Sequence, residues 1–116
     1  MNNEQFFYYL CQKFNFTYGK FKDCNILIVT QPFVDNNNSS ILFYNFDTDL
    51  VCIANKISIE SDDNIIVYEG TLSISPNQAT LCYNQLENLI NQYNEATFTI
   101  KSNILKSKLE VINKDF

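Results

Sequence analysis

The sequence has 116 residues, a formal net charge of −5, and 46% hydrophobic and 15% aromatic residues. This length is typical of one domain, and this apolar content can bury enough surface to fold, which excludes a disordered chain. Arginine, histidine and tryptophan do not occur in the sequence. The chain therefore has no imidazole for a Ser-His or Cys-His pair and no guanidinium for bidentate phosphate binding. We expect a single domain over residues 1–116.

Acidic side chains are concentrated in the middle of the sequence. Nine of the thirteen lie between Asp35 and Glu95, where Lys56 is the only cation, so this segment carries 1 − 9 = −8. Residues 1–34 carry 3 − 2 = +1, and residues 101–116 carry 4 − 2 = +2. Charge asymmetry bears on partners and solubility rather than on fold, and here it favours a protein with a negative binding surface.

The first 14 residues predict an amphipathic helix over 3–14. Its apolar residues recur at spacings of three and four: Phe6, Phe7, Leu10, Cys11 and Phe14. The segment opens with polar residues and has neither a basic n-region nor an apolar run long enough for a signal peptide or a membrane span. We therefore predict a cytoplasmic protein that does not bind membranes.

Residues 24–30 predict a central strand with both faces covered, because apolar side chains occupy both alternating sets. Pro32 and the polar run from Asp35 to Ser40 then predict an exposed loop. The apolar runs 41–46 and 50–59, joined by Asp47, Thr48 and Asp49, predict a hairpin. A second polar turn over 61–64 leads to a strand over 65–74.

Ser75, Pro76 and Gln78 predict a helix start, because Ser and Gln can satisfy end amides and Pro suits the first helical position. The apolar stripe that follows extends this helix over 76–95 and should cover one face of the sheet. Residues 97–101 alternate like a short strand, while 104–112 fit a short last helix, so the C-terminal segment has two readings. The predicted fold class is α+β: an antiparallel β-meander of four to five strands flanked by the two helices.

The four cysteines lie among apolar neighbours and form no CxxC pair, which favours buried, reduced thiols. Asp47-Thr48-Asp49 matches the DxD pattern of metal-binding transferases, but it falls where a turn is expected and no glycine-rich loop accompanies it. Asp62-Asp63-Asn64 has the same interpretation. No Ser-x-x-Lys motif or phosphate loop occurs. We expect no enzymatic activity, no catalytic residue, no metal site and no cofactor.

Direct nucleic-acid binding is disfavoured, because the cations are few and are all lysines. The acidic middle has two interpretations: solubility, or a strip that mimics a polyanion. Carboxylates two residues apart on a strand lie roughly 6.5–7 Å apart, near the spacing of successive phosphates. The residues proposed to contact a partner are Asp47, Asp49, Glu60, Asp62, Asp63 and Glu69.

The sequence therefore predicts a small, non-enzymatic protein-binding domain. Its hypothetical role is that of a phage or mobile-element inhibitor, similar in kind to anti-CRISPR proteins, that blocks a nucleic-acid-handling host protein with a basic groove. Two other kinds of binding protein stay open as alternatives, an immunity protein and a secretion chaperone. The chaperone would form a homodimer. A metal-dependent enzyme that uses carboxylates is the third alternative.

Overall fold

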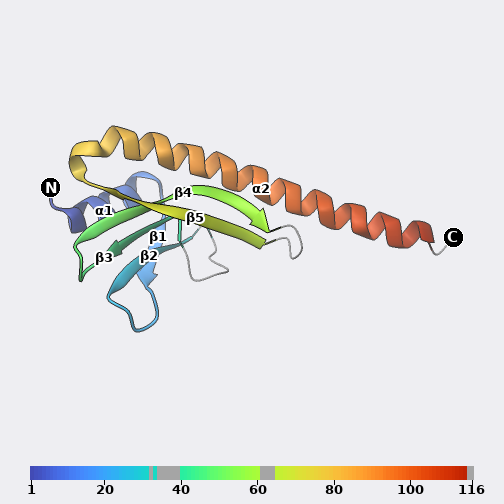
Figure 1. Ribbon diagram of the computed structural model, residues 1–116, viewed down its shortest axis with the longest axis horizontal. Coiled ribbons are helices and arrows are strands. Elements are labelled where there is room, and N and C mark those ends of the chain that lie inside the picture. The colour runs from blue at the N-terminus through green and yellow to red at the C-terminus, as the bar shows by residue number, and fades with distance from the viewer. Residues whose placement is uncertain (32, 34–39, 61–64, 115–116) are drawn as a thin grey trace.

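The computed structural model describes residues 1–31, 33, 40–60 and 65–114, and it shows an α+β fold (Figure 1). In chain order the elements are α1 (Asn3–Lys13), β1 (Thr17–Lys20), β2 (Ile26–Gln31), β3 (Leu42–Asn45), β4 (Leu50–Glu60), β5 (Ile65–Ile74), the 3-10 turn η1 (Pro76–Gln78) and α2 (Ala79–Lys114). The predicted fold class is confirmed.

The five strands form one antiparallel sheet in the order β1-β2-β3-β4-β5, which is a simple meander. β4 and β5 make the longest pair, in register from Val51 opposite Ile74 to Glu60 opposite Ile65. β1 lies in a polar segment for which no strand was predicted from the sequence. It is an exposed edge strand, and because its side chains face water its composition resembles that of a loop. The Thr17 hydroxyl lies 3.2 Å from the Thr30 hydroxyl of β2.

Both helices lie against the same face of the sheet (Figure 1), and the core forms between them. Phe7 and Leu10 of α1, Ile53 of β4, and Leu86 and Leu89 of α2 are fully buried there. The opposite face has no helix over it among the described residues. β2 is therefore an inner strand that is covered on one side, and the expectation of two covered faces is wrong: Ile26 and Ile28 are half-buried.

Helix α1 begins at a capping box, in which Gln5 N–H donates to the Asn2 side chain and Asn2 N–H donates to the Gln5 side chain. These two bonds satisfy end amides that have no partner inside the helix. At the entry to η1, Ser75 N–H donates to Oε1 of Gln78 at 3.2 Å, as its motif predicted.

Helix α2 is a single element of 36 residues. It continues through 97–101, so the alternative of a short strand there is wrong. Ala96 is buried and Ile100 packs against the core, while the Thr97 and Thr99 hydroxyls donate to carbonyls of the preceding turn, at 3.0 Å to Tyr93 and 2.9 Å to Glu95. With no glycine or proline after Pro76, the helix runs on past the sheet (Figure 1).

Two glutamines of α2 complete the sheet where β3 ends. Beyond Ala54 the β4 backbone has no partner on the β3 side in the described register. The Gln85 side chain donates to the carbonyls of Ala54 and Asn55 at 3.0 and 2.7 Å, and Ile57 N–H donates to Oε1 of Gln92 at 2.8 Å.

Cys11, Cys52 and Cys82 are buried and free, whereas Cys24 is free and exposed in the turn before β2. The N–H of Cys24 donates to the Phe21 carbonyl at 3.0 Å, which closes a tight turn. This turn points Cys24 away from the core although its neighbours in the sequence are apolar. Pro32 and residues 35–39 of the predicted loop, and the turn over 61–64, lie outside the described residues. Ser40, the last residue of that predicted exposed loop, is described and is buried, so the expectation is wrong for this residue.

Candidate functional site

The turn between β3 and β4 exposes Asp47 and Asp49, the first acidic pair singled out from the sequence. The Asn45 side chain accepts the N–H of Asp47 at 2.9 Å and that of Thr48 at 3.4 Å, which closes the turn locally. The Asn25 amide donates to Oδ1 of Asp47 at 3.2 Å. The Asp47 carboxylate is thus held at one end of the sheet by Asn25, in a turn whose backbone is fixed by Asn45.

Asp49 is tied to the body of the domain. It has a left-handed backbone with φ 53°, and its carbonyl accepts the Asn3 side chain of α1 at 2.8 Å. The buried Tyr44 hydroxyl donates to its Oδ1. This hydrogen bond, with burial, raises the pKa of Tyr44 to about 12. Because one oxygen of Asp49 is used within the protein, the carboxylate is well positioned but only partly available to a partner.

The other acidic residues of the hypothesis lie elsewhere. Glu60 ends β4, and a strand of that length spans roughly 30 Å, so Asp49 and Glu60 stand at opposite ends of it (Figure 1). Glu69 lies on β5 and forms a 3.2 Å ion pair with Lys56, which lowers its pKa. Asp62 and Asp63 lie outside the described residues. The structure therefore brings Asp47 and Asp49 together, and does not place Glu60 or Glu69 beside them.

The described residues offer little reactive chemistry. Within them, no group of three or more acidic or cysteine side chains lies close enough together to hold a metal ion. Burial raises the pKa of the Cys11 and Cys82 thiols to about 12. A thiol with such a pKa is almost entirely protonated near neutrality and is a poor nucleophile.

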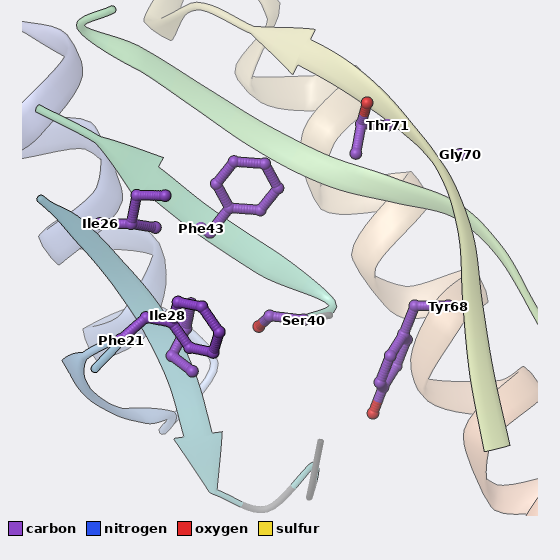
Figure 2. A pocket seen from close by; sticks show the side chains of 8 residues that line it. All are labelled: Phe21, Ile26, Ile28, Ser40, Phe43, Tyr68, Gly70 and Thr71. Carbon is purple, nitrogen blue, oxygen red and sulfur yellow. The ribbon is translucent and has the colours of Figure 1, made fainter. Parts of the chain in front are cut away.

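The face of the sheet that has no helix over it among the described residues carries a shallow pocket of about 200 Å³ (Figure 2). Its lining is largely apolar and comes from Phe21, Ile26, Ile28, Ser40, Phe43, Tyr68, Gly70 and Thr71. The Ser40 hydroxyl donates to the Leu42 carbonyl at 2.9 Å and is not activated by a neighbouring base in this lining. The pocket can accommodate a small apolar group, but its lining has no pair of groups suited to acid-base chemistry.

A second surface feature lies on the outward side of α2. Over the body of the domain this side presents exposed polar residues, Glu87, Asn91 and Asn94. From residue 98 the same side becomes apolar: Phe98 is 73% exposed, Leu105 59% and Leu109 51%. We call residues 98–109 the distal segment of α2. Three large apolar side chains in water on one helix side are typical of an interaction surface.

The acidic turn was proposed from the sequence as a contact surface, whereas the distal segment was not. The helical periodicity that marks this segment is present in the sequence, because Leu105 lies seven residues after Phe98 and Leu109 four residues after Leu105. Treating 97–101 as a strand broke this periodicity in two.

Comparisons with protein-family models, with curated proteins and with solved structures found no match. The class of protein is therefore described by its fold alone: a small α+β domain whose described residues form a five-stranded meander and a long helix α2. Among the described residues no helix is both long and apolar enough to cross a membrane.

Proposed function

We propose that this chain is a non-enzymatic protein-binding domain. The observation that carries the proposal is the change in the outward side of α2 from polar to apolar at Phe98. Exposing these side chains costs solvation free energy, roughly 1.5–3 kcal/mol for each large apolar side chain relative to its burial. A protein partner that covers them recovers this energy. Burial raises the pKa of the Cys11 and Cys82 thiols to about 12, so these two groups are poor nucleophiles near neutrality.

A narrower form of this proposal is an inhibitor that occupies the basic groove of a nucleic-acid-handling protein, in the manner of an anti-CRISPR protein. Its support is the excess of acidic residues between Asp35 and Glu95 and the fixed turn that presents Asp47 and Asp49. This form uses the turn end of the sheet, opposite the distal segment (Figure 1). The two surfaces can be tested separately.

The test is affinity purification of the tagged full chain from the cell that produces it, after cross-linking with an amine-reactive reagent. We expect a stoichiometric partner cross-linked at Lys101, Lys106 or Lys108, which are exposed on the distal segment. Leu105→Ser should abolish capture, because it removes an apolar contact without touching the body. The Asp47→Asn/Asp49→Asn variant should reduce capture and its salt dependence if the turn contributes. Absence of any captured protein would contradict the proposed function.

A further inference from the structure

The outer side of the distal segment has the spacing of a helix-pairing seam. Phe98, Ser102, Leu105 and Leu109 follow one another at intervals of four, three and four residues. At about 100° per residue they fall within an arc of roughly 60°. A narrow stripe with a 3.5-residue period is typical of a helix that pairs with one other helix, whereas a helix that covers a sheet has a wider apolar face.

Lysines border this seam on both sides. Lys101 and Lys108 lie on one side and Lys106 on the other, at the positions that flank the apolar seam of a coiled coil. All three are exposed. The distal segment contains no acidic residue, so its flanks carry a uniform positive charge.

This charge pattern indicates which kind of partner the seam can bind. Two copies paired through their distal segments would bring six lysines along one seam, and like charges at the flanking positions oppose pairing. An anionic membrane is opposed by the net charge of −5 and by the narrowness of the apolar stripe. Carboxylates at the flanking positions of a partner helix would instead face lysines on both sides.

We propose that the distal segment of α2 binds an amphipathic helix of another protein whose apolar seam is flanked by glutamate or aspartate. This inference rests on the proposed function and specifies the chemistry of its partner. The seam from Phe98 to Leu109 is about 16 Å long, which corresponds to three turns of the partner helix. Ser102, the small and half-buried member of the seam, leaves room for a large partner side chain.

The probe is a fluorescein-labelled peptide of three heptads with leucine at the seam positions and glutamate at the flanking positions. A twin peptide carries lysine at the flanking positions. Each is titrated with the full chain and followed by fluorescence anisotropy. We expect the acidic peptide to bind at least about tenfold more tightly than its twin, and its affinity to fall as salt is raised.

Three variants connect this binding to the seam. Leu105→Ser should lower the affinity for the acidic peptide by about tenfold or more, because it removes a central apolar contact. Leu81→Ser is the matched control, since Leu81 is an exposed leucine of the same helix at its other end. It should leave the affinity unchanged. Lys101→Glu/Lys106→Glu/Lys108→Glu should reverse the preference toward the lysine peptide. Circular dichroism checks that each variant keeps its helix content.

Several outcomes would overturn the inference. One is equal affinity for the two peptides, and another is the same loss with Leu81→Ser as with Leu105→Ser. A dimer in sedimentation experiments that Leu105→Ser converts to monomer would identify a second copy as the occupant. Binding to phosphatidylcholine/phosphatidylserine vesicles that Leu105→Ser abolishes would identify a membrane.

The two proposals fail in different ways. If the unaltered chain captures a cellular partner but neither peptide is preferred, the acidic-helix inference is wrong while the protein-binding function stands. If the unaltered chain captures no partner, the protein-binding function itself is wrong.

Discussion

Gly70 interrupts the long β5 strand with a left-handed backbone, φ 70°. A Cβ at this position would lie 3.0 Å from Cβ of Asn55 on the neighbouring strand. An L side chain would therefore meet both backbone strain and a close contact in the middle of a hairpin. A glycine inside a strand often marks such an irregularity, but the sequence does not show which residue lies opposite it.

Replacing Gly70 by alanine should destabilise the protein by about 1–3 kcal/mol, the usual cost of a strained backbone conformation. Gly19→Ala is the matched control. The nearest atom to a Cβ there is Cγ2 of Thr30 at 3.8 Å, and the position has no left-handed φ. Its free energy of unfolding should change by less than about 0.5 kcal/mol. Urea unfolding of both variants measures the difference, and equal losses would argue against strain at Gly70.

At the scale of elements, α2 stabilises the sheet through hydrogen bonds as well as through apolar packing. Gln92→Ala should cost about 1–3 kcal/mol, because the partly buried Ile57 N–H loses its acceptor. Asn91→Ala, at the exposed neighbouring position, is the control and should be near neutral. Amide hydrogen exchange at Ile57 should accelerate in Gln92→Ala alone. Unchanged protection of that amide would show that the glutamine is dispensable.

The elements also show what the sequence could and could not predict. The strands over Leu50–Glu60 and Ile65–Ile74 were predicted almost to the residue, because apolar content and turn residues mark their ends. The length of α2 was not, because Thr97, Thr99 and Ile100 have β-branched side chains that also suit a strand. The hydrogen bonds of Gln85 could not be predicted either, because a glutamine that faces the sheet resembles a solvent-facing one in sequence until its backbone partner is known. For the candidate site, the sequence predicted that Asp47 and Asp49 share a turn but could not place Glu60 relative to them.

For the whole molecule, stability should depend on pH on the alkaline side. Burial raises the pKa of Cys11 and Cys82 from 9.0 to about 12, and the hydrogen bond to Asp49, followed by burial, raises that of Tyr44 from 10.0 to about 12. The folded state therefore binds protons that the unfolded state releases at lower pH. The resulting stabilisation is complete below about pH 9 and is lost as pH rises towards 12.

Urea unfolding at a series of pH values from about 8 to 11 should show this decline. In Cys11→Ala/Cys82→Ala the baseline stability should be lower, since two buried side chains are shortened, but the fall with pH should be shallower. A fall of the same steepness in the double variant would mean that these thiols are not its source.

The strand order has a consequence for how the chain reaches this structure. Because each strand pairs with the strand next to it in sequence, every hairpin can close soon after its second strand is synthesised, and loop-closure entropy stays small. The contact between Asn3 of α1 and Asp49 before β4 is different, since it joins residues 46 apart. Docking of α1 must therefore wait until β4 has been synthesised, and α2 docks later still, since Tyr83 contacts Tyr9 of α1 and Gln92 contacts Ile57 of β4. The β4–β5 hairpin needs only adjacent segments of the chain.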